Sequence, residues 1–172
     1  MSPEPNRYLG KFRGTVVVNV DPLRQGRIQV QVPDVLGSVP SSWAMPCLPV
    51  AGPQMGQYVV PPVGAGVWVE FEQGDPSFPI WTGCWYGSQA EVPAVALLGP
   101  PVAPNMVLQT VAGHHILLSD QPGNAGITLR TATGATLSVT DRGIVLDNGQ
   151  GAVISMVGAT VTVNRGALTV ST

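Results

Sequence analysis

Hydrophobic and polar residues alternate in short runs along the first half of the chain. Residues 27–32 alternate without exception, which predicts a strand with Ile28, Val30 and Val32 facing a core. Residues 67–72 alternate in the same way and place Trp68, Glu70 and Glu72 on an outer face. Further strands are expected over residues 12–20, 43–50 and 78–86, and the prolines of the second place it at a sheet edge. Five short strands favour a small closed barrel of the OB type.

The second half follows a different period, which glycine sets. Glycines stand at positions 126, 134, 143, 151, 158 and 166. Apolar residues occupy the first and third positions after each of the first five glycines: Ile127 and Leu129, Ala135 and Leu137, Ile144 and Leu146, Ala152 and Ile154, Ala159 and Val161. After the last glycine the apolar pair is shifted by one residue, to Leu168 and Val170. This pattern predicts strands joined by tight turns, with one apolar face. Roughly eight such strands are expected from Val107 onward, about 4.8 Å apart.

A ribbon of this kind is too thin to bury itself. Each strand offers two or three small apolar side chains and open backbone edges. Three copies wound around one axis would bring the inward faces together and give the edges partners. A single-chain solenoid is the alternative, although solenoid coils commonly need 20 or more residues. The predicted fold is therefore all-β, with an N-terminal five-stranded OB-type barrel followed by a C-terminal intertwined trimeric β-helix or β-prism.

Aromatic residues mark the boundary between the two halves, since all of them lie between Tyr8 and Tyr86. Residues 87–105 are rich in proline, alanine and glycine and are typical of an extended connector. Only residues 94–98 show a weak helical pattern. The expected domains are an N-terminal extension (1–9), the barrel (10–87), a proline-rich connector (88–106) and the spike (107–172).

Composition supports burial in an assembly. Charged residues make up 10% of the chain, against about 25% in a typical domain, while hydrophobic residues reach 44%. A membrane span is excluded, because four prolines interrupt the uncharged stretch between Val92 and Ser119 and no run of about 20 apolar residues remains. The net charge of −2 provides no strong attraction for nucleic acid.

Candidate catalytic and metal-binding residues are few. Glu70 and Glu72 share a face as paired carboxylates would, but a solvated surface or a partner contact explains them better. His114 and His115 point to opposite faces of a strand, so a metal would need three copies of one histidine, His114, around a threefold axis. Ordinary strand-entry residues are the stronger interpretation. No catalytic triad, phosphate loop or zinc spacing is visible, so no enzyme and no cofactor are expected.

The remaining polar candidates have structural interpretations. Three aspartates near the turns fit turn chemistry better than calcium binding, and three arginines balance them as surface ion pairs: Asp120, Asp141 and Asp147, with Arg130, Arg142 and Arg165. Cys47 and Cys84 fall in separate strands. Free, buried thiols are favoured over a disulfide bridge in a chain made in the cytoplasm.

Several segments in order resemble the phage baseplate assembly protein V family, the central spike proteins of contractile tails, and the related valine–glycine-repeat spikes of type VI secretion. GKFRGTVVVNVDPLRQGRIQVQVP (10–33) resembles the opening hairpin of the family, and Trp43-Ala44 its next strand. PPVGAGVWVEFEQGDP (61–76) resembles its signature, which PIWTG (79–83) continues. The segment from Gly113 to Gly123 and the glycine repeat resemble the entry to the prism.

The resemblance implies a structural role: a homotrimer that caps the tube and mechanically punctures the target envelope. It implies a location in a virion tail baseplate or an extracellular injection particle, after synthesis in the bacterial cytoplasm. A separate hub protein is expected above the barrel, because the barrel begins within about ten residues. The last segment, 166–172, has no histidine apex, so a separate tip-capping protein is expected there. Contact with the target envelope would be transient.

A second interpretation is an OB-fold protein that binds single-stranded nucleic acid. Five basic residues precede Asp34, and three tryptophans (Trp68, Trp81 and Trp85) are candidates to stack bases. The negative net charge and the two glutamates beside Trp68 argue against this interpretation. The prism also argues against it, because a nucleic-acid-binding protein would have no use for one. A third interpretation is a cell-wall hydrolase. The chain has neither the catalytic residues for it nor enough length in the connector to hold such a domain.

Overall fold

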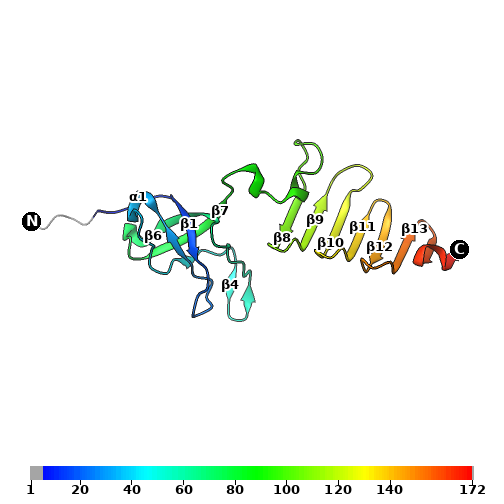
Figure 1. The fold of residues 1–172 in the computed structure, drawn as a ribbon, viewed down its shortest axis with the longest axis horizontal. Helices are drawn as coiled ribbons and strands as arrows, with labels where there is room; N and C mark the ends of the chain where they lie inside the picture. The colour runs from blue at the N-terminus through cyan, green and yellow to red at the C-terminus, as the bar shows by residue number, and fades with distance from the viewer. Residues whose placement is uncertain (1–5, 172) are drawn as a thin grey trace, which may run out of the picture. The chain divides into compact units, whose positions relative to one another are not determined.

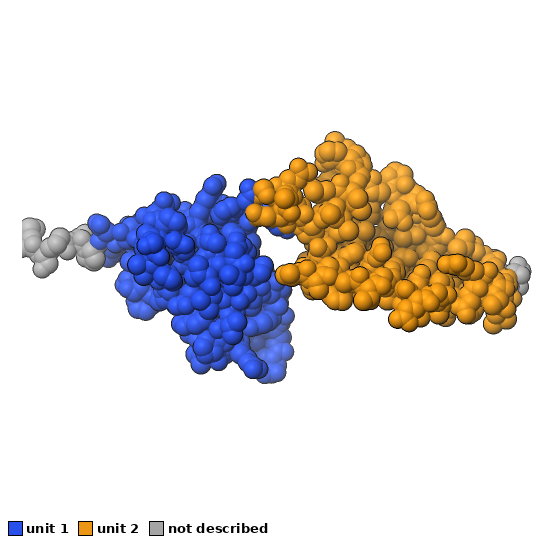
Figure 2. All heavy atoms as spheres, viewed as in Figure 1, with its two compact units in different colours: residues 1–87 blue, residues 88–172 orange. Residues whose placement is uncertain are grey.

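The computed structural model describes residues 6–171, which divide after Gly87 into two compact units (Figures 1 and 2). Both units are built from β-strands, as the sequence predicts. Residues 1–5 of the expected N-terminal extension and Thr172 of the expected spike lie outside the described residues. Within residues 6–171, no helix is long and apolar enough to cross a bilayer.

The first unit contains a five-stranded sheet in the order β2–β1–β6–β7–β3 (Figure 1). Its strands are β1 (Phe12–Val18), β2 (Gln29–Gln31), β3 (Met45–Pro46), β6 (Gly66–Phe71) and β7 (Pro79–Trp85). Antiparallel pairing joins β1 to β2 and β6, and β6 to β7, while β3 runs parallel to β7. The five predicted strands are confirmed, and the proline-broken segment forms only the two-residue strand at the end of this order.

One short segment closes this sheet into a barrel. The amide of Ala44 donates to the carbonyl of Ile28 at 2.8 Å, and Ile28 donates back at 3.2 Å, which links the segment to β2. Three residues later, the amide of Cys47 donates to the carbonyl of Trp81 at 2.9 Å on β7. The same run therefore pairs with both ends of the sheet, and the OB-type barrel is confirmed.

The barrel core follows the predicted alternation. Ile28, Val30 and Val32 are completely buried, as is the inward-facing set of β6. The buried hydrophobic residues form one cluster: Val16, Ile28, Val30, Val32, Ala44, Val67, Val69, Phe71 and Trp81. The indole of Trp81 donates to the carbonyl of Gly26 at 3.1 Å, so the one polar atom of this core tryptophan is satisfied.

Three short elements of the barrel were not predicted. A single helical turn, α1 (Pro33–Leu36), follows β2, and a small hairpin joins β4 (Ala51–Gly52) to β5 (Met55–Gly56). The strand expected over residues 67–72 ends at Phe71, because η1 (Glu72–Gly74) turns the chain through left-handed angles at Gln73 and Gly74. Glu72 therefore does not share a strand face with Glu70.

Both cysteines are free, and both are exposed. The expectation of buried thiols is wrong, because both cysteines lie at the ends of strands of the barrel. Cys47 follows the two-residue strand β3, and Cys84 lies near the end of β7, opposite Val67.

The second unit is an antiparallel sheet of eight strands, each paired with its neighbours in sequence (Figure 1). The strands are β8 (Met106–Gln109), β9 (His115–Ser119), β10 (Gly126–Arg130), β11 (Thr136–Thr140), β12 (Gly143–Asp147), β13 (Val153–Val157), β14 (Thr160–Val163) and β15 (Leu168–Ser171). The predicted glycine-punctuated strands are confirmed, and the sheet is compatible with one wall of a β-prism. Within residues 6–171, open edges of this sheet remain only at β8 and β15, whereas open edges were expected on every strand.

The glycines of the repeat are of two kinds. Gly126 and Gly143 are the first residues of β10 and β12, whereas Gly134 and Gly151 lie within turns. The alanines that follow the turn glycines, such as Ala135, lie just before a strand and not within it. The sequence pattern therefore places Leu137 and Ile154 within strands and the alanines at the turns that precede them.

The connector is not extended as expected. It folds into two 3-10 turns, η2 (Gln89–Glu91) and η3 (Ala94–Leu97), and belongs to the second unit. The side-chain amide of Asn105 donates to the carbonyls of Val95 and Leu98, at 3.0 and 3.2 Å, and so holds η3 near the start of β8. The weak helical pattern of residues 94–98 corresponds to η3.

Candidate assembly interface

The strand register of the second unit places two continuous rows of aliphatic side chains on one face of the sheet. Residues directly opposite each other in antiparallel strands lie on the same face, so each row is read from the register. The first row is Leu108, Ile116, Leu129, Leu137, Leu146, Ile154, Val163 and Leu168. The second row is Met106, Leu118, Ile127, Val139, Ile144, Met156, Val161 and Val170. We call these two rows the apolar face.

The single chain leaves the apolar face uncovered. Its side chains are exposed by as much as 69% at Met106, and even Leu137, near the middle, is 36% exposed. Polar residues of the opposite face, such as Thr128 and Ser138, are less exposed than the leucines between them. Full burial of one leucine stabilises a protein by about 1.5–3 kcal/mol. The sheet therefore presents a large apolar surface that a second layer would need to cover.

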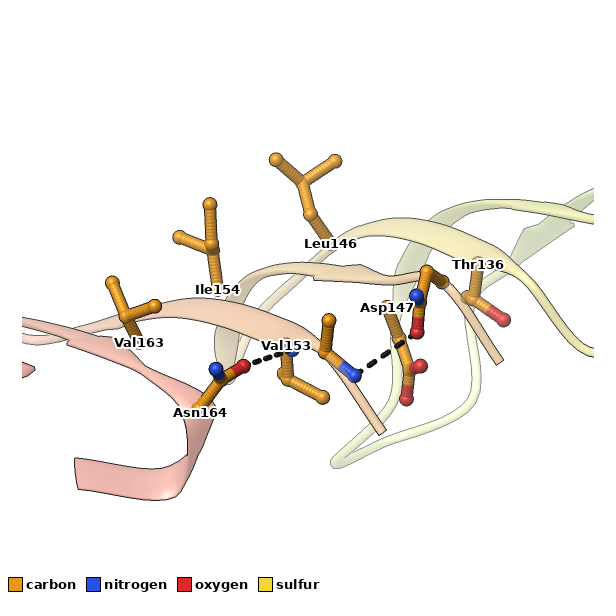
Figure 3. A pocket seen from close by; sticks show the side chains of 9 residues that line it. Thr136, Leu146, Asp147, Val153, Ile154, Val163 and Asn164 are labelled. Carbon is orange, nitrogen blue, oxygen red and sulfur yellow. Dashed lines mark hydrogen bonds between the residues drawn. The ribbon is translucent and has the colours of Figure 1, made fainter. Parts of the chain in front are cut away.

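A shallow hollow near β12 and β13 shows how this face is built (Figure 3). Leu146, Ile154 and Val163 point to the same side of the sheet and line it, together with polar residues at the adjoining turns. Two of those polar side chains hold turns. The side-chain oxygen of Asn164 accepts the Val153 amide at 3.1 Å, and the side-chain oxygen of Asn148 accepts the amides of Gln150 and Ala152. The hollow is part of the apolar face, and its walls are mainly aliphatic.

Two of the three aspartates of the second unit stabilise turns. Asp141 accepts the amide of Gly123 at 3.1 Å, and Asp147 accepts the amide of Gly149 at 2.7 Å. This confirms the turn interpretation for these two residues. The expected ion pairs are not formed within the chain, since among the residues that the structure describes no aspartate of the set bridges to Arg130, Arg142 or Arg165.

His114 ends the turn before β9, and His115 is the first residue of that strand. His114 Nδ1 accepts the amide of Ala132 at 3.2 Å, and His115 Nδ1 donates to the carbonyl of Gly113 at 3.1 Å. Each therefore supports a turn, which fits the strand-entry interpretation. Over residues 6–171, no group of three metal-ligating side chains gathers within one chain. A metal held by His114 from three chains stays a prediction.

Glu70 and Glu72, the candidate pair of catalytic carboxylates, do not lie together on the outer face of the barrel. Glu70 forms an ion pair with Lys11 at 2.7 Å, and Lys11 also donates to Thr82 at 3.1 Å. Since Glu72 lies in the turn, the paired-carboxylate arrangement is absent from this face. Glu70 is thus one half of an exposed ion pair.

The three tryptophans proposed to stack bases are separated too. Trp81 is buried in the core, whereas Trp68 and Trp85 pack at 6.3 Å around the guanidinium of Arg13. Arg13 lies 5.8 and 5.2 Å from the two ring centres, and its charge is directed to the rings. The nucleic-acid interpretation loses one of its three stacking residues, and this arrangement does not favour it.

A buried carboxylate, missed in the sequence, fixes the loop between β1 and β2. Asp21 accepts hydrogen bonds from the amides of Leu23, Gln25 and Arg27 and from the guanidinium of Arg27, the closest at 2.7 Å. Arg27 also stacks on Trp43 at 5.4 Å. The Arg27 hydrogen bond, helped by the amides, holds the pKa of Asp21 well below its usual range despite its burial.

We expect Asp21→Asn to lower the melting temperature of the barrel by roughly 5–10 °C near neutral pH. Because the folded pKa of Asp21 is depressed, its contribution is complete above the unfolded pKa of about 4 and is lost as the pH falls below it. Tryptophan fluorescence follows this transition, since every tryptophan lies in the first unit. The gap between parent and variant should narrow in acid, and a gap that stays constant from pH 7 to pH 3 would contradict this role.

Sequence reasoning also missed part of the apolar face. Met106, Leu108, Ile116 and Leu118 precede the glycine repeat, so glycine phasing did not reveal them. Their alternation within two short runs was the available signal, and the register of β8 and β9 shows that they extend both rows.

Two family models match the chain. A type VI secretion system/phage-baseplate injector OB domain matches residues 12–86, which contain the barrel sheet. A phage baseplate V C-terminal trimerisation domain matches residues 105–169, which contain most of the eight-stranded sheet and its apolar face. No curated protein matches the chain.

Proposed function

We propose, since the chain belongs to the phage baseplate V family, that it acts as the homotrimeric central spike of a contractile tail or injection machine. In this role the trimer caps the tube and mechanically punctures the target envelope. The function is structural, and no catalytic step is assigned to any residue.

The apolar face carries this proposal. It extends along all eight strands of the region that matches a trimerisation domain, and the single chain does not cover it. Three copies that turn this face toward a common axis would bury both rows together. The barrel already has its own closed core, so the need for partners is concentrated in the second unit.

A puncturing device needs rigidity and slow dissociation more than it needs a reactive group. The eight strands form a continuous ladder of backbone hydrogen bonds within one chain. Burial of the apolar face among three chains would couple the ladders, so that no chain could leave without exposing both rows. Such an assembly is kinetically stable, because its unfolding requires many contacts to break together.

The remaining partners follow from this role. A hub protein would bind above the barrels, and a separate tip-capping protein would bind at the β15 end of the sheet. The protein would reside in a tail baseplate or injection particle after synthesis in the cytoplasm, with transient envelope contact and no nucleic-acid partner. Affinity purification of assembled particles tests this: hub and tip proteins should copurify with the chain, and their absence from intact particles would reject these partners.

The test of the central proposal is the mass of the purified protein in solution. We expect three times the chain mass of 17.9 kDa by light scattering, at all accessible concentrations. The trimer should also persist on a gel in sodium dodecyl sulfate unless the sample is boiled. A folded particle with the mass of one chain would refute the proposal, since the apolar face would then be stable in water.

A further inference from the structure

The turns of the eight-stranded sheet form two lateral edges. In an antiparallel meander, alternate turns lie on opposite edges. The turns of residues 110–114, 131–135, 148–152 and 164–167 form one edge, which we call the His114 edge. The turns of residues 120–125, 141–142 and 158–159 form the other, which we call the Asp141 edge.

Threefold symmetry determines which edges would meet. If three sheets turn their apolar faces toward one axis, they stand side by side around it. Rotation about the axis does not reverse a sheet, so the His114 edge of each copy always meets the Asp141 edge of the next. Such a contact is heterologous, and it forms a closed ring only if the two edges meet at the same level.

Opposite charges lie at the same level of the two edges in two places. At β9 and β10, the Asp141 edge carries Asp120, while the His114 edge carries Arg130 opposite His115. At β12, the Asp141 edge carries Arg142 and the His114 edge carries Asp147. Two further charges have no such counterpart: Asp141, beside Arg142, accepts the amide of Gly123, and Arg165 lies on the His114 edge, whereas the turn of residues 158–159 on the Asp141 edge is uncharged.

These charges cannot pair within one chain. Arg142 and Asp147 flank the same five-residue strand, β12, and are separated by about 16 Å along it. Among the described residues, the two ion pairs of the chain are Lys11–Glu70 and Arg27–Asp21, both in the barrel. Within residues 6–171, the charges of the two edges therefore form no ion pair in one chain, and another copy can supply their partners across each contact.

We propose that the two edges are a docking surface for a second copy of this chain, in which Asp120 meets Arg130 and Arg142 meets Asp147 across each contact. This inference rests on the proposed trimer and specifies its register. The apolar rows repeat with nearly uniform leucine, isoleucine and valine, so they provide little resistance to a stagger between chains. Exposed ion pairs add little stability, but a stagger would remove them or bring like charges together. The charges thus favour the closed ring over a staggered, open assembly.

Paired cysteines test which edges meet. In the full chain, Cys47→Ser and Cys84→Ser first remove the two native thiols, both of which are exposed. Arg142→Cys with Asp147→Cys then places one thiol on each edge at the same strand. We expect air oxidation to produce covalent trimers on a non-reducing gel. The matched control is Arg142→Cys with Arg130→Cys, which lie on opposite edges but two strands apart, about 10 Å, beyond the reach of a disulfide.

The mass of each variant, measured before oxidation, separates the two proposals. If the variants are trimers but the matched pair does not crosslink, or the mismatched pair crosslinks equally, the edge assignment is wrong and the trimer stands. If the variants and the parent chain have the mass of one chain, both proposals fall. As a second measurement, Arg142→Asp should speed dissociation in hot detergent several-fold, and adding Asp147→Arg should restore the parent rate.

Discussion

Leu137→Asp is expected to abolish trimer formation while leaving the barrel folded. Leu137 lies in the first row, between Leu129 on β10 and Leu146 on β12. In a trimer, the substitution would bring three carboxylates to the axis. The cost of burying an unpaired charge is several kcal/mol per ion, so three copies lose on the order of 10 kcal/mol. Light scattering should report the mass of one chain, or aggregates formed through the exposed face.

The control for this substitution is Ser138→Asp, on the next residue of the same strand. Ser138 lies on the opposite face, level with Thr128 and Val145, and its carboxylate would face solvent. This variant should remain a trimer with barrel fluorescence unchanged. If Leu137→Asp forms a trimer as stable as that of Ser138→Asp, the apolar face is not the interface.

Gly143→Ala is expected to have the second-largest effect on assembly. Gly143 begins β12 with φ at +137°, a conformation that a side chain strains by about 1–3 kcal/mol. A Cβ at this position would also collide with the carbonyl oxygen of Met156, which is backbone and cannot move aside alone. Three copies in a trimer would multiply the cost to about 3–9 kcal/mol before the collision is counted. On a gel, the Gly143→Ala trimer should therefore dissociate in sodium dodecyl sulfate without boiling.

Gly158→Asn is the matched control at a neighbouring turn. Gly158 has φ at +56° with no atom near the position of a Cβ, and asparagine tolerates this left-handed conformation. The turn belongs to the Asp141 edge but takes part in neither proposed ion pair, so the resistance of this variant to detergent should stay nearer to that of the parent than to that of Gly143→Ala. Equal resistance of the Gly143→Ala trimer would show that the β12–β13 pairing can shift without loss.

The barrel was predictable because its strands alternate. Ile28, Val30 and Val32 belong to a run in which every second residue is apolar, and only one face of such a strand can enter a core. The hairpin of Ala51–Gly52 and Met55–Gly56 has no such pattern, and its side chains stay exposed. Glu72 was misplaced because two residues with left-handed φ end the strand, which alternation cannot reveal.

The apolar face was predictable only in part. Glycine spacing indicated the strands, but it does not distinguish Gly143, which begins a strand, from Gly134, which lies in a turn. The pairing register was needed to separate them and to add Val139 to the face. The Asp21 network was missed because three of its donors are backbone amides, which no residue type specifies, and because its pairing with the Arg27 side chain depends on the course of the loop.

Neighbour-to-neighbour pairing of the eight strands also bears on biogenesis. Each hairpin of the sheet closes a short stretch of chain, and contacts between residues close in sequence form quickly. The ladder can thus be completed by a nascent polypeptide alone, before it meets its sisters. Encounter between copies is then the slower step and depends on how many are present in the cell. During that interval the most hydrophobic surface of the polypeptide is exposed to solvent. This is when the polypeptide is most vulnerable to aggregation.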